Sequence, residues 1–224
     1  MNKSDFRILI TRDKENRILT VEDNGIGMTK EELEQNLGTI AHSGSLDFKK
    51  DNKDENIDII GQFGVGFYSA FMVADKLTVI SKAYGSDEAW QWESSGVDGY
   101  EMTPAQKDTA GTQIILHIKP DTETDHYDNF LDEYGIVAIV KKYSDYVRYP
   151  IQMERQHERQ KPEPDPKPED YKPEWETYTE LETLNSMVPI WKKQKSEVTD
   201  EEYANFYKDC LLYTSPSPRD RSLS

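Results

Sequence analysis

The sequence predicts an α+β fold, a two-layer sandwich in which helices cover a mostly antiparallel sheet. Two β-rich runs, at residues 6–11 and 17–21, are close enough along the chain to pair as a hairpin. Helical patterns occur between later strands, but they do not alternate with the strands as regularly as in a doubly wound fold. These two observations favour antiparallel pairing over a parallel sheet.

The first elements follow from local signals. The hairpin turns at residues 13–16, DKEN, whose residue types favour turns. Thr29 and Glu32 then have the spacing of a capping box, in which each side chain accepts a hydrogen bond from the backbone N–H of the other residue. Two leucines follow at helical spacing. We therefore expect a short helix over residues 30–37.

The later elements follow from hydrophobic periodicity. Runs of small and apolar residues predict helices, and β-rich or alternating runs predict strands. In chain order, we expect a helix at 67–74, strands at 76–81, 89–93 and 111–118, and a helix at 127–147.

The chain is strongly acidic, with 43 Asp and Glu residues against 27 Lys and Arg residues and a formal net charge of −16. This balance repels phosphates, so we expect no nucleic-acid partner. No apolar run approaches the ~18–20 residues that span a bilayer, and no secretory signal is recognisable, so we expect no membrane partner and a cytoplasmic location. One cysteine, Cys210, and four scattered histidines predict neither a disulfide framework nor a metal centre.

The segment DNGIGM at residues 23–28 permits two interpretations. It can be a plain turn between a strand and a helix, in which Asp23 bonds nearby backbone as an Asx turn. It can also be a nucleotide site, in which a buried Asp23 carboxylate accepts a hydrogen bond from an exocyclic amine and the glycines let the backbone approach the base. The segment by itself does not decide between them.

A second glycine-rich segment, GQFGVG at residues 61–66, precedes a predicted helix. It lacks the Gly-Lys-Ser/Thr end of a P-loop, and its glycine order is the reverse of the dinucleotide-binding fingerprint. Such a turn can still bind phosphate through backbone N–H groups at a helix N-terminus, or it can simply allow close packing. Gly111 and Thr112, which open a strand, are by themselves compatible with an ordinary strand start.

Taken together, the motifs resemble the heat-shock protein 90 family, most closely its bacterial members. The matching segments are DNGIGMT at 23–29, NLGTIA at 36–41, GQFGVGFYSAF at 61–71 and the Gly111-Thr112 pair, followed by WKKQKSEVTDEEY at 191–203, which resembles the start of the family's middle domain. The resemblance covers residues 5–209. It implies the GHKL, or Bergerat, ATP-binding fold, lacking that fold's first strand and helix.

The resemblance also implies a role for each matching residue. Asp23 would recognise adenine, and a mobile lid over residues 38–66 would close over ATP. The implied ATP-binding residues are Asp23, Gly25, Gly27 and Met28 at the base, Asn36 near the ribose and α-phosphate, the backbone amides of Gly64, Val65, Gly66 and Phe67 at the phosphates, and Thr112 behind the adenine. His42 stands where the family usually has a phosphate-facing lysine, so it is a candidate phosphate contact that is mostly uncharged at neutral pH.

The resemblance divides the chain into four parts. We expect an amino-terminal ATP-binding domain at 1–156, a charged, Pro-rich linker or loop at 157–176, and the start of the middle domain at 177–209. Residues 210–224 match nothing in the family, and we interpret them as a non-native tail. The family's glutamate general base and magnesium-binding asparagine lie on the helix that precedes the first residue here. We therefore assign no catalytic residue and no metal ligand, and we expect this chain not to hydrolyse ATP.

The expected function is that of a fragment of an ATP-dependent molecular chaperone of the stress response. Its implied partners are unfolded or partly folded client proteins and a second copy of the full-length chain, and its implied ligands are ATP and, for the family, Mg²⁺. Two alternatives stay open: the catalytic domain of a sensor histidine kinase, against which the middle-domain segment argues, and a non-catalytic interaction fragment. A nucleotide titration would separate the last alternative from the first interpretation.

Overall fold

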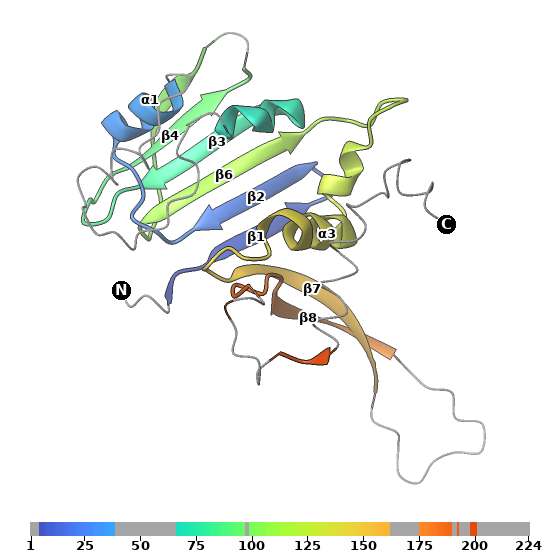
Figure 1. Cartoon of the computed structure of the whole chain (residues 1–224). Helices are drawn as coiled ribbons and strands as arrows, with labels where there is room; N and C mark the ends of the chain where they lie inside the picture. Colours follow the sequence, from blue (N-terminus) through green and yellow to red (C-terminus); the bar gives the residue numbers. More distant parts are fainter. Residues whose placement is uncertain are drawn as a thin grey trace, which may run out of the picture.

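The computed structural model describes residues 5–38, 66–96, 99–161, 175–189, 192 and 198–200. In these ranges, eight strands form one sheet in the order β5-β4-β3-β6-β2-β1-β7-β8. All neighbouring strands are antiparallel except β1 and β7, which are parallel. Helices pack against one face of this sheet (Figure 1). The predicted α+β fold with a mostly antiparallel sheet is confirmed.

The elements have the following bounds. The chain forms β1 (Ile8–Asp13), β2 (Ile18–Asp23), α1 (Lys30–Gly38), the 3₁₀ helix η2 (Phe67–Met72), β3 (Ala74–Lys82), β4 (Ala89–Ser94), β5 (Glu101–Ala105), β6 (Gly111–Ile118), the 3₁₀ helix η3 (Tyr127–Phe130), α3 (Glu133–Ser144), β7 (Ile151–Gln160) and β8 (Trp175–Thr183).

Local side-chain chemistry explains the first three elements. The carboxylate of Asp13 accepts hydrogen bonds from the backbone N–H of Asn16 at 3.0 Å and from its Nδ2 at 2.7 Å, which closes the turn between β1 and β2. The predicted capping box is present: Thr29 N–H donates to Glu32 Oε2 at 2.8 Å, and Glu32 N–H donates to Thr29 Oγ1 at 3.3 Å. α1 therefore begins where the sequence predicts it.

An apolar layer between the sheet and the helices forms the core. It consists of two clusters that both contact Leu19 and Val21 of β2. The first cluster packs α1 on the central strands through Leu33, Leu37, Leu77, Val79, Trp92 and Leu116. The second packs α3 on β1 and β7 through Ile10, Ile136, Val140, Ile151 and Met153. Burial of this layer fixes which face of the sheet the helices cover.

Two predicted helices differ from the structure. The helix expected at 127–147 is divided into η3 and α3, because Asp132 caps a new helix by accepting the Gly135 N–H at 3.0 Å. The helix expected at 67–74 is a shorter 3₁₀ helix that ends at Met72, because Ala74 already pairs with Ile118 in the sheet.

The sequence patterns also miss three strands, β5, β7 and β8. β7 and β8 pair over residues 152–160 and 175–183, so strands extend into the segment expected to be a linker. Their polar residues are compatible with a sheet because opposite charges pair between the two strands, diagonally in Arg155 with Glu182 at 2.9 Å and directly across in Arg159 with Glu176 at 2.5 Å. The domain boundaries themselves stay a prediction.

Candidate functional site

The ends of three central strands lie together at one end of the sheet. β2 ends at Asp23, β3 ends at Lys82 and β6 begins at Gly111, and β6 is antiparallel to both of the other strands. The loop after β2 lies across this point, where Ile26 accepts a backbone hydrogen bond from Tyr84 at 2.7 Å. The structure thus brings together the 23–28 segment and the Gly111-Thr112 pair, which are far apart in the sequence.

Asp23 lies at the centre of this arrangement. Its Oδ1 accepts the Gly25 N–H at 2.8 Å, and the backbone N–H of Thr112 also donates to the carboxylate. Burial raises the pKa of Asp23 above its ordinary value, and these two hydrogen bonds and the charge of Lys107 only partly offset that effect. A carboxylate has about four acceptor positions. Asp23 therefore makes the Asx turn and keeps the capacity to accept a ligand amine, so the two interpretations of this segment are compatible.

Two glycines allow the strand ends to approach one another. Gly27 has a φ of +63°, and a Cβ there would lie 1.9 Å from the carbonyl oxygen of Lys82. Gly111 has a φ of +125°, and a Cβ there would lie 2.1 Å from the carbonyl oxygen of Asp23. Any side chain at either position would force the backbones apart and open the site.

Sequence reasoning missed Ser81, which is fully buried at the end of β3. Its hydroxyl accepts the Met28 N–H at 2.8 Å and lies 2.9 Å from Thr112 Oγ1 and 3.2 Å from the Gly111 carbonyl oxygen. This one side chain therefore joins the loop after β2 to the start of β6. The sequence does contain one signal for Ser81. Strand alternation places it on the same inward face as Leu77 and Val79, where a polar residue is unusual.

Met28 and Asn36 extend the site toward α1. Met28 packs against the first core cluster, and Asn36 Nδ2 lies 3.6 Å from Met28 Sδ, in the range of a weak hydrogen bond to sulfur. The helix therefore places Asn36 beside the loop, whereas its position near the ribose and α-phosphate of a nucleotide stays a prediction.

The residues that are predicted to bind phosphate lie only partly within the described ranges. Phe67 packs edge-to-face on Trp92, with ring centroids 5.4 Å apart, and contacts the same core cluster as Met28. Gly66 precedes η2 as its N-cap residue. Gly64, Val65 and His42 lie outside the described residues.

The part of the chain that the structure describes was compared with the requirements of a metal centre and of a membrane-crossing helix. No group of three or more His, Cys, Asp or Glu side chains there is arranged to hold a metal ion. None of the helices within those residues has the length and apolar character needed to cross a membrane.

Two segments of the chain match known family models. Residues 5–117 match the model described as "Histidine kinase-, DNA gyrase B-, and HSP90-like ATPase", and residues 160–214 match the model described as "Hsp90 protein". The chain belongs to the heat-shock protein 90 family.

Curated proteins that are similar to this chain carry the name Chaperone protein HtpG. The relative from Clostridium botulinum is 57% identical over 208 residues, and the relative from Clostridium perfringens is 55% identical over 207 residues, each match covering 92% of this chain and 32% of the relative. The relative from Natranaerobius thermophilus is 56% identical over 211 residues, 93% of this chain and 32% of its own. The chain thus spans about a third of the length of these relatives.

The position of Ser81 leads to a testable expectation about nucleotide binding at the candidate site. Ser81→Ala should weaken adenine-nucleotide binding about tenfold, since the Met28 N–H and the Thr112 hydroxyl both lose a partner. Calorimetric titration with ADP measures the effect. Ser94→Ala is a matched control, because Ser94 is also a buried serine that accepts a backbone N–H, but it pairs with the far end of β3. Equal losses of affinity in both variants would contradict a role for Ser81 at the site.

Proposed function

We propose that this chain is the ATP-binding part of an ATP-dependent chaperone that acts on unfolded or partly folded client proteins. The observation that supports this most is the position of Asp23, a carboxylate of raised pKa that lies where the ends of β2, β3 and β6 converge. The chain also matches a family model of ATPases. The names of the relatives support the chaperone part of the proposal. The match of residues 160–214 to the Hsp90 model favours a chaperone over a sensor histidine kinase.

In this proposal, the carboxylate of Asp23 accepts a hydrogen bond from the 6-amino group of adenine. Gly27 and Met28 lie against the base, Thr112 supports Asp23 from behind, and Asn36 contacts the sugar side of the nucleotide. The hydroxyl of Ser81 holds the loop and β6 at a fixed separation, so the base meets a preformed surface. The phosphates are bound by the backbone amides of 64–67, and His42 is a further phosphate contact.

Further parts of the proposal concern the full-length protein. We propose that the full-length protein works as a cytoplasmic homodimer, binds ATP together with Mg²⁺, and engages neither nucleic acid nor membrane. The 224-residue polypeptide taken alone is proposed to bind ATP without hydrolysing it, since none of its residues matches the family's general base or its magnesium-binding asparagine. Phosphate release well above the background of a no-enzyme control would contradict that last point.

The test of the proposed function compares ATP with GTP. Guanine carries a carbonyl oxygen where adenine carries its 6-amino group, so GTP presents an acceptor to the acceptor Asp23. We expect saturable ATP binding in a calorimetric titration of the purified chain and a loss of about 100-fold or more with GTP. Equal affinities for the two nucleotides would remove Asp23 as the base-reading group.

The raised pKa of Asp23 sets the sign of a pH effect. Only the carboxylate form accepts the adenine amine, and the raised pKa means that Asp23 takes up a proton at a higher pH than an ordinary aspartate. The affinity for adenosine, which has no phosphates for His42 to contact, should therefore fall as the pH is lowered from about 8, and the fall should begin above the ~3.9 at which ordinary aspartates titrate. A titration series over this range measures the effect. The Asp13→Asn variant, changed in the hairpin turn, should reproduce the profile of the parent, and an affinity that rises on acidification would overturn the assignment.

A further inference from the structure

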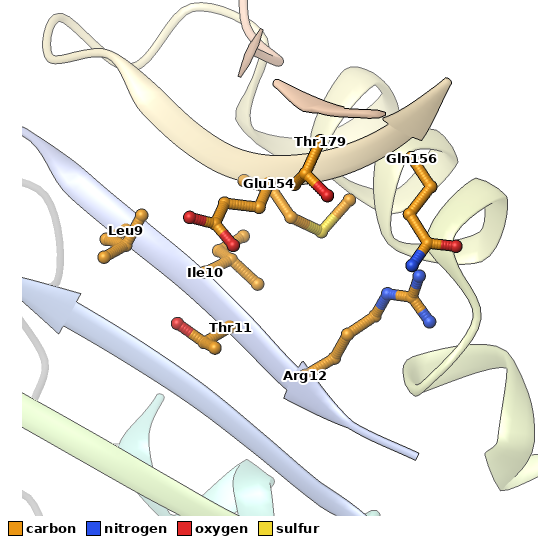
Figure 2. Close-up of a pocket in the computed structure, with 8 residues that line it drawn as sticks. Leu9, Ile10, Thr11, Arg12, Glu154, Gln156 and Thr179 are labelled. Atoms are coloured by element: carbon orange, nitrogen blue, oxygen red, sulfur yellow. The ribbon is translucent and has the colours of Figure 1, made fainter. Parts of the chain in front are cut away.

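A cavity of about 410 Å³ lies between β1, β7 and β8 (Figure 2). Its size is within the range of ligand-binding pockets, ~300–1,000 Å³. It does not include Asp23, Ser81 or Thr112, so it is separate from the site described above. Its lining consists of three apolar residues, Leu9, Ile10 and Met153, and five polar residues, Thr11, Arg12, Glu154, Gln156 and Thr179.

The cavity exists because β1 and β7 diverge. Their parallel pairing spans only the register pairs from Ile8 with Ile151 to Ile10 with Met153. β1 then ends at Asp13, whereas β7 continues to Gln160 with β8 on its other side. Figure 1 shows this continuation of β7 beyond the body of the sheet. Beyond Met153, no described strand pairs with the β1-facing edge of β7.

The main-chain groups that face this free edge can be identified. Pro150 O accepts the Ile8 N–H at 2.9 Å on the β1 side, whereas Ile151 O accepts the Leu184 N–H at 2.7 Å on the β8 side. Because the direction of these groups alternates along a strand, the even-numbered residues of β7 face the β1 side. The N–H and C=O groups of Gln156, Glu158 and Gln160 therefore point away from β8, toward the free edge.

The charges along β7 differ between its two faces. Met153 and Arg155 point toward α3, where Arg155 donates to Glu133 at 2.8 Å. The cations on this face are all engaged, Arg155 also with Glu182 and Arg159 with Glu176. Glu154 and Glu158 lie on the opposite face and have no ion-pair partner within the described residues. Arg12, the one cation that lines the cavity, is itself paired with Glu133 at 3.2 Å. The free edge is thus bordered by uncompensated negative charge.

We propose that the free edge of β7, residues 154–160, binds an extended peptide with basic side chains, which adds to the sheet as a further strand. Main-chain hydrogen bonds to Gln156, Glu158 and Gln160 supply affinity. Glu154 and Glu158 are four residues apart, about 13 Å along a strand, so they select basic side chains at the same spacing. An apolar side chain at the end of the peptide fills the cavity beside Leu9 and Met153. The charged edge repels a second copy of itself, which leaves it open to a partner of opposite charge.

The test uses the whole 224-residue chain and a fluorescein-labelled nonapeptide with leucine at its first position, lysines at its third and seventh positions, and threonine and valine elsewhere. We expect saturable binding below about 1 mM by fluorescence anisotropy. Two control peptides should not bind: one with glutamate in place of lysine, and one N-methylated on the amides that pair with β7. No saturable binding of the lysine peptide, or equal binding of the N-methylated peptide, would overturn the proposal.

Two protein variants locate the peptide. Gln156→Pro removes an N–H that faces the free edge and leaves the pairing with β8 intact, so it should weaken binding about tenfold or more. Glu158→Lys should weaken binding to a similar extent of about tenfold through like-charge repulsion, whereas Glu180→Lys, with the same charge change on β8, should leave the affinity unchanged. Equal losses in Glu158→Lys and Glu180→Lys would show general attraction to an acidic protein and overturn the proposal.

A further measurement does not depend on the folding of any variant. The peptide should slow hydrogen exchange of the Gln156, Glu158 and Gln160 amides in the parent protein, and unchanged exchange there in the presence of saturating peptide would overturn the proposal. Asp23→Asn should leave peptide binding unaltered, so failure of the peptide site and failure of the nucleotide site can be distinguished.

Discussion

Asp23→Asn is expected to lower the affinity of the chain for ATP and ADP by about 100-fold or more, which corresponds to ~2.7 kcal/mol. The carboxylate accepts hydrogen bonds from Gly25 and Thr112 and has remaining capacity for the adenine amine. An asparagine keeps one acceptor oxygen, which can maintain the Asx turn with Gly25. Its amide nitrogen, however, presents a donor toward the adenine amine, so two donors face each other and the charge-assisted hydrogen bond is lost.

Calorimetric titration with ADP measures this loss, and Asp13→Asn provides the matched control. Asp13 also accepts a backbone N–H in a turn, from Asn16 at 3.0 Å, but it lies in the β1–β2 hairpin. The control should bind nucleotide like the parent. An Asp23→Asn variant with the affinity of the parent would show that Asp23 is only a turn residue.

Glu133→Gln is expected to lower the free energy of unfolding by about 2 kcal/mol, a large part of the ~5–15 kcal/mol that stabilises a domain. Glu133 opens α3, and its side chain is only 11% exposed. It accepts from Arg12 of β1 at 3.2 Å and from Arg155 of β7 at 2.8 Å. A neutral amide weakens both hydrogen bonds, leaves two guanidinium groups without a full counter-charge, and removes a favourable negative charge from the helix N-terminus.

Urea denaturation of the purified chain measures the difference. Glu154→Gln is the matched control, because Glu154 lies beside Arg155 on β7 and has no ion-pair partner among the described residues. It should change the free energy of unfolding by less than about 0.5 kcal/mol. If both variants lose the same free energy of unfolding, the contacts of Glu133 with the two arginines stabilise the fold no more than an exposed surface charge does.

The parts of the fold that the sequence predicts are those with local causes. The hairpin depends on Asp13 and Asn16, and α1 depends on Thr29 and Glu32, so a short window contains all the information. The break before α3 is also local, but the capping signal of Asp132 lies inside a continuous helical pattern that hides it. β7 and β8 depend on ion pairs between residues 17 to 27 positions apart, which a scan for apolar alternation cannot detect.

The candidate site shows the same division. Asp23, Gly27 and Met28 are recognisable because they lie in one short motif, and resemblance adds Asn36 and Thr112 from separate motifs. Ser81 could not be found in this way. It is a single serine in a β-rich run, and its role depends on a register that becomes visible only when β3 and β6 are paired. Where Gly64, Val65 and His42 lie relative to a nucleotide stays a prediction.

The position of β2 between β1 and β6 has a consequence for synthesis of the chain. β2 is complete at Asp23, but β6, its other neighbour, begins only at Gly111. A ribosome adds ~5–20 residues per second, so the newly made hairpin exposes an unpaired edge for about 4–18 s before its partner emerges. Unpaired strand edges are where nascent chains mispair and aggregate. A protein of the heat-shock protein 90 family therefore passes, during its own translation, through the exposed state that a folding helper would protect.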